Sequence, residues 1–320
     1  MKELDLIKEI TKIFNKNNDK SIIMGPGDDC AVLDLGDKNN FYVFTVDEMV
    51  EDTHFILDFL KPEEVASKLV RMNVSDIFSM GRANPLYSLV SGGINFKRID
   101  DKWILRFLKT LKKELDFWGI KNIGGNLSRS SSIFFSMKLI GKVEKKYVVY
   151  RKGTKEGDLL CVYGFCGSSM AVVDIMKTKK RKDITKIEEK LVYDFAKPIL
   201  YKDFIWKNCK YFSSMIDNSD GIYRSALILS KENNLKVVID FKNMEKLIKP
   251  EVLKWCKINK KNPFDYSLFG GEDYNPIFSV SEKNLNFLND KNIKIIGRFE
   301  KGKGVEVLNY NGKIKNFEHF

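Results

Sequence analysis

Residues 62–81, PEEVASKLVRMNVSDIFSMG, are the stretch on which the fold of the first half depends. Apolar side chains recur in it at helical spacing, which predicts one long helix from about Pro62 to Met80. Strands are predicted near Ala31–Leu35 and Phe41–Val46 before this helix, and near Leu86–Ser91 after it. The first half is therefore predicted to be a mixed α+β unit.

The same mixed pattern continues to the end of the chain. The expected elements are an opening helix, a helix from about Asp100 to Trp118, a strand pair on either side of Gly124-Gly125, a strand at Leu159–Tyr163, a helix after Gly167, helices around Ile184–Cys209, and then strands alternating with helices. Residues 143–157 are polar and rich in turn formers, so we place a domain boundary there. The sequence thus predicts two domains, residues 1–145 and residues 146–320.

Composition fits a globular protein of this size. The 320 residues include 43% hydrophobic ones, which is enough to fill two cores. No apolar run approaches the ~20 residues that span a bilayer, and the opening segment resembles an amphipathic helix more than a signal peptide. We therefore expect a cytoplasmic protein with no membrane partner.

Cysteine and histidine usage limits the chemistry. The five cysteines are scattered and include no CxxC pair, which argues against a disulfide framework or a structural zinc site. His54 and His319 are the only histidines, so a catalytic or metal site built from several imidazoles is not expected. Any metal is expected to be a hard cation on oxygen ligands.

The net charge of +12 raises the question of a nucleic-acid partner. The lysines are spread along the chain, with Lys177–Lys182 the densest patch, and stacking aromatic residues are not interleaved with them. We interpret them as a solvated surface whose field would also attract phosphorylated substrates. A basic nucleic-acid-binding module is the lowest-ranked hypothesis, and no nucleic-acid partner is expected.

Acidic residues gather in short blocks that contain or adjoin turn formers. The blocks are GPGDDC at 25–30, TVDEMVEDTHF at 45–55, NVSD at 73–76, IDNSDG at 216–221 and GGEDY at 270–274. Each is expected at a strand end, a turn or a helix start, and a single block would indicate only a turn or an N-cap. If the blocks converge, their carboxylates repel one another unless cations neutralise them.

Magnesium is the cation that these blocks fit. It prefers carboxylate oxygens and keeps water or substrate phosphates in its remaining positions, which makes phosphoryl transfer the leading reaction class. Neither the P-loop pattern GxxxxGK[ST] nor the glycine-rich and catalytic-loop signatures of protein kinases occur. The phosphates must be held in another way.

Taken in order, the motifs resemble one family. GDDCAVL, TVDEMVEDTHF, NVSDIFSMG, Gly124-Gly125, RKGTKEGD, SMIDNSDGI, GGEDY and a terminal EHF follow one another as in thiamine-monophosphate kinase, and the resemblance runs nearly end to end. This family belongs with aminoimidazole ribonucleotide synthetase, HypE-type proteins and selenophosphate synthetase. An early Cys followed closely by Lys, and a terminal Cys, are both absent, which argues against the last two.

The resemblance implies a two-domain PurM-like α+β fold. Residues 1–145 would bind ATP and Mg²⁺ and contribute strands to a barrel shared by a homodimer, while residues 146–320 would form an α/β domain that completes the nucleotide and substrate site. The implied reaction is direct in-line transfer from ATP to thiamine monophosphate, assisted by several Mg²⁺ ions, without a phosphoenzyme.

The resemblance also implies roles for individual residues. Magnesium would be held by Asp29, Thr45, Asp47, Asp76, Asn126, Asp217 and Asp220. The ATP phosphates would be held by Gly125, Asn126, Arg151 and Ser219, and the thiamine phosphate by His54, Glu272 and Ile314. Asp47, Asp76, Arg151 and Asp220 would be the catalytic residues. Structural alternatives are a helix end for Asp76, a helix cap for Ser219 and Asp220, and a surface cation for Arg151.

Two positions depart from the family pattern. Asn126 stands where the family has Asp, so a magnesium site would lose one negative charge. Ile314 stands where the family tends to have an aromatic residue that stacks on the substrate pyrimidine. They keep two alternatives open: a related enzyme acting on another small phosphorylated substrate, and a weakened nucleotide-binding paralogue.

Overall fold

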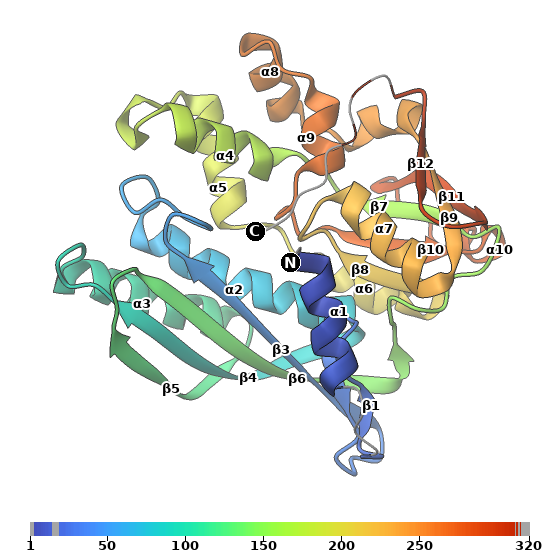
Figure 1. The fold of residues 1–320 in the computed structure, drawn as a ribbon, viewed down its shortest axis with the longest axis horizontal. Coiled ribbons are helices and arrows are strands. Elements are labelled where there is room, and N and C mark those ends of the chain that lie inside the picture. Colours follow the sequence, from blue (N-terminus) through green and yellow to red (C-terminus); the bar gives the residue numbers. More distant parts are fainter. Residues whose placement is uncertain (1–2, 15–18, 311, 313, 315–320) are drawn as a thin grey trace.

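The computed structural model describes residues 3–14, 19–310, 312 and 314 and contains two six-stranded sheets, each with its own helices (Figure 1). The first sheet lies in the first half of the chain and the second sheet in the second half. The predicted α+β fold is therefore confirmed. The terminal EHF motif lies outside the described residues.

The first sheet is a long, mostly antiparallel sheet with the order β1-β2-β3-β6-β4-β5. Its strands are β1 (Ile22–Met24), β2 (Ala31–Leu33), β3 (Asn40–Val50), β4 (Gly81–Ile94), β5 (Lys121–Arg129) and β6 (Phe134–Val148). Only the β4–β5 pair is parallel, because α3 (Asp101–Phe117) connects these two strands. Helix α1 (Glu3–Phe14) precedes the sheet.

Helix α2 (Pro62–Ser79) is the central element of the molecule, and nearly all of its residues are buried. One side packs on the first sheet, where Thr45 Oγ1 donates a 2.5 Å hydrogen bond to Asp76. The other side faces the second half, where Ser75 Oγ donates a 2.9 Å hydrogen bond to Asp217. A helix covered on two sides needs apolar residues around most of its circumference, which explains its composition.

The second sheet has the order β12-β9-β11-β7-β10-β8. Its strands are β7 (Leu159–Tyr163), β8 (Ser214–Asp217), β9 (Leu235–Asp240), β10 (Pro276–Val280), β11 (Ile293–Lys301) and β12 (Val305–Leu308). The helices of this half are α4 (Ser168–Thr178), α5 (Lys186–Ala196), α6 (Lys202–Asn208), α7 (Ile222–Asn233), α8 (Pro250–Ile258), α9 (Pro263–Phe269) and α10 (Glu282–Leu285), with 3₁₀ turns at Arg181–Asp183, Cys209–Tyr211 and Phe241–Leu247.

A continuous apolar core joins the two halves. One cluster of buried side chains runs from the first sheet through α2 and α5 to β7 and β10, and a second fills the other face of the second sheet. Polar contacts reinforce the junction: Trp206 Nε1 donates to the Ala83 carbonyl at 3.0 Å, and Arg71 Nη1 to the Pro198 carbonyl at 2.9 Å. The two sheets are thus held in one arrangement.

The structure corrects the predicted turn at Gly124-Gly125. Both glycines lie inside the single strand β5. A Cβ on Gly125 would lie 1.7 Å from the Val90 carbonyl oxygen, so glycine is needed for β5 to approach β4, and not for a turn.

The structure corrects the first part of the turn-rich segment predicted at 143–157, because β6 continues to Val148, whereas residues 149–157 contain no helix or strand, as predicted. Charged residues near the end of this strand hid its strand character. Lys145, for example, pairs with Asp34 at 2.8 Å. The predicted division after residue 145 stays a prediction.

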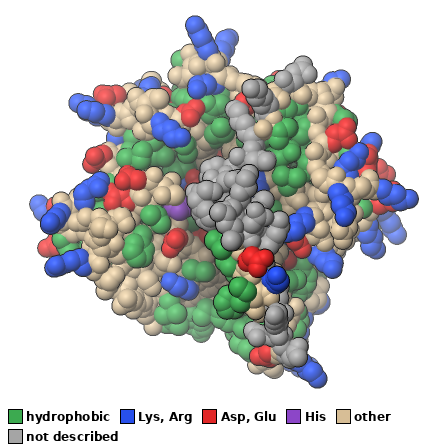
Figure 2. Space-filling model, in the orientation of Figure 1, with side chains coloured by type: hydrophobic (Ala, Val, Ile, Leu, Met, Phe, Trp, Pro, Cys, Tyr) green, Lys and Arg blue, Asp and Glu red, His purple; other side chains and the backbone are tan. Residues whose placement is uncertain are grey.

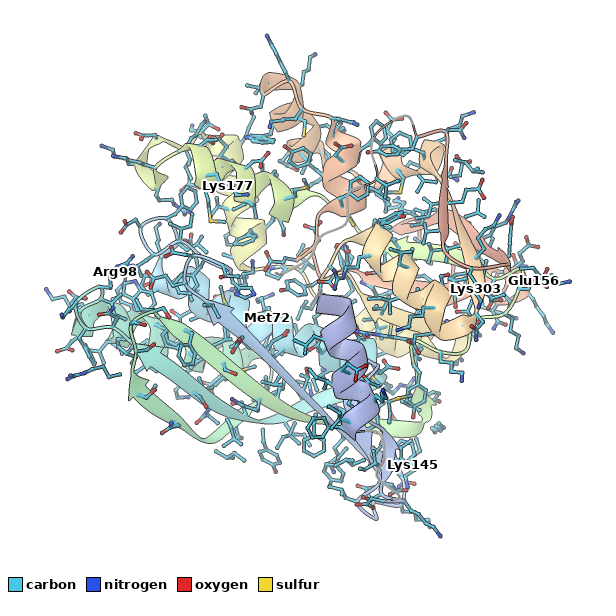
Figure 3. The ribbon with its side chains drawn as sticks, in the orientation of Figure 1. Met72, Arg98, Lys145, Glu156, Lys177 and Lys303 are labelled. Carbon is cyan, nitrogen blue, oxygen red and sulfur yellow. The ribbon has the colours of Figure 1, made fainter. Side chains whose placement is uncertain are left out.

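Charge is distributed around the edge of the molecule. Figure 2 shows lysine and arginine side chains projecting at the rim of the visible face, with hydrophobic side chains along its middle. In Figure 3, Lys145, Lys177 and Lys303 lie on three separate projections, whereas Met72 of α2 lies at the centre. The five cysteines are buried free thiols, and none of the helices in the described part is long and apolar enough to span a membrane.

Candidate active site between the two halves

Three carboxylates from distant parts of the chain meet beside α2. Asp29 precedes β2, Asp76 lies in α2, and Asp217 ends β8. Each offers an oxygen within 4.8 Å of the others. The blocks GPGDDC, NVSD and IDNSDG therefore converge in space, as their composition suggested.

Neighbouring hydroxyl groups orient two of these carboxylates. Thr45 donates to Asp76, and Asp217 accepts hydrogen bonds from Ser75 at 2.9 Å and Ser219 at 2.8 Å. Asp29 Oδ2, in contrast, is buried and has no hydrogen-bond partner among the described residues. A buried carboxylate oxygen without a donor is the kind of atom that a cation satisfies.

Arg151 supplies a positive charge to this cluster. Its Nη2 lies 2.5 Å from Asp29 Oδ1, and its backbone N–H donates to Asp28 at 3.0 Å. Burial opposes the charged form of Arg151, but the carboxylates around it outweigh that effect and raise its pKa above the ordinary value. The Nε–H of Arg151 has no acceptor within the described structure, so the guanidinium retains a donor for an anionic ligand.

The carboxylates hold their protons more tightly than ordinary aspartates. Burial, followed by repulsion from neighbouring carboxylates, raises the pKa of Asp47 to about 8 and that of Asp217 to about 7. Burial is also the main cause of the raised pKa values of Asp29 and Asp76. Burial and mutual repulsion both destabilise the ionised carboxylates. A divalent cation would offset both effects, since it replaces the lost hydration and neutralises the repulsion.

Two further predicted ligands adjoin the three carboxylates. The charges of Asp217 and Asp220 both raise the pKa of Asp47, which places the three groups in one electrostatic environment. The backbone N–H of Asp47 donates to Asn73 Oδ1 at 3.1 Å, and Asp220 forms a 3.0 Å ion pair with Arg224. The five aspartates predicted from the sequence thus influence one another electrostatically, and three of them, Asp29, Asp76 and Asp217, lie within 4.8 Å of one another.

The local settings of these aspartates differ from the prediction. Asp47 lies inside β3 and Asp76 inside α2, whereas strand ends, turns or helix starts were expected. Gly221 is the N-cap of α7, so the alternative of a cap formed by Ser219 and Asp220 is wrong. Asp217 does lie at the end of β8, and Asp29 lies in a bend two residues before β2.

The three predicted substrate residues belong to different segments of the chain. His54 follows β3, and its Nδ1 accepts a 3.1 Å hydrogen bond from the Val50 N–H, which leaves the proton on Nε2. Glu272 is joined to the acidic site through its backbone N–H, which donates to the Ser219 carbonyl at 2.7 Å. Ile314 is 47% exposed, and its flanking residues lie outside the described ranges.

Gly125 and Asn126 do not lie with the aspartates of the same chain. Asp47 is in register with Met137 of β6, Met137 with Val90 of β4, and Val90 with Gly125 of β5. Three strand spacings therefore separate Asp47 from Gly125, about 14 Å. Because successive residues alternate between faces, Asn126 lies on the opposite face of the sheet from Asp47.

Sequence reasoning missed several residues that orient the site. Asn73 and Ser75 belong to the quoted NVSD block, so a signal existed, but only Asp76 was assigned. Asp28, whose pKa is raised to about 7 by burial and by the charge of Asp29, stood beside an assigned residue. Lys68 pairs with Glu272 at 3.0 Å, and no motif marks it.

The fold and the site first define a class of proteins. The family model described as AIR synthase related protein, N-terminal domain, matches residues 27–143. A solved structure of E. coli HypE, a hydrogenase maturation protein, covers 98% of this chain with a TM-score of 0.66 at 14% identity, so it shares the fold. The chain thus has the architecture of the AIR synthase related class.

Closer relatives identify the family within that class. The thiamine-monophosphate kinase of Aquifex aeolicus is 31% identical over 295 residues, which cover 92% of each chain, and that of Methanocaldococcus jannaschii is 30% identical, covering 89% of this chain and 87% of its own. The structure of AaThiL complexed with AMPPCP and TMP covers 100% of this chain and 97% of its own, with a TM-score of 0.87 and 30% identity. The chain belongs to the thiamine-monophosphate kinase family.

Proposed function

We propose that this protein transfers the γ-phosphoryl group of ATP to thiamine monophosphate, giving ADP and thiamine diphosphate. The observation that carries the proposal is the convergence of Asp29, Asp76 and Asp217 within 4.8 Å, in a chain that matches thiamine-monophosphate kinases over nearly its full length. The AaThiL structure that it resembles contains AMPPCP and TMP. An ATP-using enzyme of this kind is expected in the cytoplasm.

Several Mg²⁺ ions are proposed as the cofactor. The unsatisfied oxygen of Asp29 and the raised pKa values of Asp47 and Asp217 fit a site built for hard cations. The proposed protein ligands are Asp29, Thr45, Asp47, Asp76, Asp217 and Asp220, with Asn126 as a neutral amide ligand. When bound, magnesium would screen the repulsion between the two phosphorylated substrates.

The protein residues would align the reactants. Arg151, through its Nε–H, and Ser219 would hold ATP phosphate oxygens, and the backbone of Gly125 would join them only from a second copy of the chain. The attacking monophosphate oxygen is already largely anionic near neutral pH, since its second pKa is ~6, so no strong base is needed. This oxygen forms the new bond to the γ-phosphorus while the bond to the β–γ bridging oxygen breaks, and ADP carries away the electron pair.

His54 and Glu272 are proposed to contact the thiamine phosphate substrate. Val50, which fixes His54, lies three residues beyond Asp47 along β3, about 10 Å away. Ile314 is proposed as an apolar contact with the substrate ring.

A homodimer is proposed because Asn126, one of the proposed ligands, lies away from the aspartates of its own chain. Every residue of edge strand β5 is exposed, including Ile123 (56%) and Leu127 (60%). An exposed apolar edge strand favours pairing with another chain. Because Asn126 is about 14 Å from Asp47 and on the other face of its own sheet, it would join a metal site only across such an interface.

One alternative rests on a specific observation. Asn126 is neutral where the family has Asp, so the predicted set of magnesium ligands carries one negative charge fewer. This difference favours a weakened nucleotide-binding paralogue over an active enzyme. The retained aspartates, with an unsatisfied oxygen at their centre, favour the enzyme. A related enzyme that uses another small phosphorylated substrate has the same metal site and differs only in its acceptor.

The deciding assay measures products directly. Purified protein is incubated with Mg²⁺ and ATP, with thiamine monophosphate, thiamine or no acceptor, and both ADP and thiamine diphosphate are quantified. The proposal predicts one thiamine diphosphate per ADP with thiamine monophosphate alone. ATP binding without any turnover would support the paralogue instead, and ADP release with another phosphate ester only would change the substrate.

A further inference from the structure

Lys68 occupies a position that the proposed reaction does not yet explain. It lies in the second turn of α2, and its side chain is completely buried. Its Nζ is 3.0 Å from Glu272 Oε2 and 3.0 Å from the ring centroid of Phe195 in α5. A buried ammonium is costly unless it is paired, and burial lowers the pKa of Lys68 to about 8 even beside Glu272.

The backbone of Glu272 is fixed from the other side. Its φ of +60° lies in the left-handed region, which costs a residue other than glycine about 1 kcal/mol. Its N–H donates to the Ser219 carbonyl, and its own carbonyl accepts from Ser169 Oγ at 2.8 Å. Gly271 allows its segment to lie close to the Ser219 backbone, because a Cβ at this position would be 2.1 Å from the Ser219 carbonyl oxygen.

The ion pair between Lys68 and Glu272 connects the helix that carries Asp76 to a segment of the second half of the chain. Lys68 and Asp76 belong to the same helix, about two turns apart, so their separation is rigid at about 12 Å. Glu272 belongs to the second half of the chain and is one hydrogen bond away from Ser219. Of the contacts described for Glu272, the ion pair with Lys68 is the one that restrains its carboxylate.

We infer that Lys68 is a positioning residue for the acceptor substrate: its ammonium holds the Glu272 carboxylate at a fixed place relative to Asp76. The inference rests on the proposed contact between Glu272 and thiamine monophosphate. Lys68 touches neither substrate; it acts by limiting the rotamers of Glu272, so that the entropy of ordering this side chain is lost before the substrate binds.

The same helix offers a matched control. Arg71, one turn further on, is also buried in a 3.0 Å ion pair, but with Glu114 of α3. Replacing either cation with methionine removes a buried ion pair from α2 and retains an apolar stem. Only the Lys68 change reaches Glu272.

The test is a double-mutant cycle with steady-state kinetics. Lys68→Met, Glu272→Gln, the double variant and Arg71→Met are compared with wild type for KM of each substrate, kcat and Tm. Lys68→Met is expected to raise KM for thiamine monophosphate about tenfold or more, with kcat and KM for ATP nearly unchanged. In the Glu272→Gln background the same change should add nothing.

Opposite outcomes separate the inference from the proposed function. Additive effects in the double variant, an unchanged KM in Lys68→Met, or an equal rise in Arg71→Met would each overturn the positioning role while leaving the kinase activity established. A wild-type protein that makes no thiamine diphosphate would overturn both. If Lys68→Met does not fold, Lys68→Gln also removes the charge but keeps a polar group at this position, and an unchanged KM for thiamine monophosphate in that variant would refute the inference.

Discussion

Replacing Asp47 with asparagine should abolish activity and stabilise the magnesium-free protein. Burial and the charges of Asp217 and Asp220 raise the pKa of Asp47 to about 8, so at pH 7 the folded protein keeps a proton that the unfolded chain releases. The ordinary aspartate pKa is about 4, and each intervening pH unit corresponds to about 1.4 kcal/mol. Keeping this carboxyl protonated therefore costs the folded state at most about 4 kcal/mol at pH 7.

The sign of the pH dependence follows from the same shift. A raised folded-state pKa means that the contribution of Asp47 to stability is intact below about pH 4 and is lost progressively as the pH rises towards 8. Asp47→Asn has no proton to lose, so its advantage over wild type should be small at pH 5 and largest at pH 8. At pH 7 the gain in Tm should be on the order of 5–10 °C.

Thermal unfolding in EDTA and in excess Mg²⁺, between pH 5 and 8, measures this directly. Magnesium should raise the Tm of wild type far more than that of the variant, because the variant lacks a ligand. Asp116→Asn is the control, since that side chain is 51% exposed in α3 and its replacement should change stability by about 0.5 kcal/mol or less. Normal turnover by Asp47→Asn would remove the metal assignment, and an unchanged EDTA stability across the pH range would refute the electrostatic reasoning.

Three further predictions concern positions where the chain departs from its family or where backbone approach is tight. Asn126→Asp should leave turnover equal or higher and lower the Mg²⁺ concentration needed for half-maximal rate; a clear loss of activity would show that the amide is required. Ile314→Trp should lower KM for thiamine monophosphate without changing kcat, and an unchanged KM would place residue 314 away from the substrate. Gly125→Ala should disrupt the β4–β5 pairing, since the added Cβ would meet a backbone oxygen at 1.7 Å; an intact dimer of wild-type stability in sedimentation would contradict this.

The sequence predicted those parts of the site that depend on local motifs. Asp29, Asp76 and Asp217 were assigned because the short motifs that contain them resemble those of thiamine-monophosphate kinase, and matching such motifs needs no knowledge of how the chain folds. Helix α2 was placed within about one residue at each end, because its apolar periodicity runs without interruption. In both cases the information is contained in a few neighbouring residues.

The features that the sequence did not predict depend on contacts between segments that are far apart in the chain. Gly124-Gly125 suggested a turn, since nothing local reveals that another strand passes close to it. Lys68 resembled any other lysine of a helix, and only the arrangement of the two halves places it against Glu272. The separation of Asn126 from Asp47 likewise follows from the strand order, which a single sequence does not specify.

The position of α2 between the two halves restricts how this chain can change in length. One inserted residue turns the following part of a helix by about 100° and advances it by about 1.5 Å. An insertion between Lys68 and Asp76 would swing Asp76 away from Thr45 while Lys68 stayed beside Glu272. Insertions and deletions should therefore be excluded from residues 62–79 and accepted in exposed connections such as 34–39, because the length of α2 sets the distance between Lys68 and Asp76.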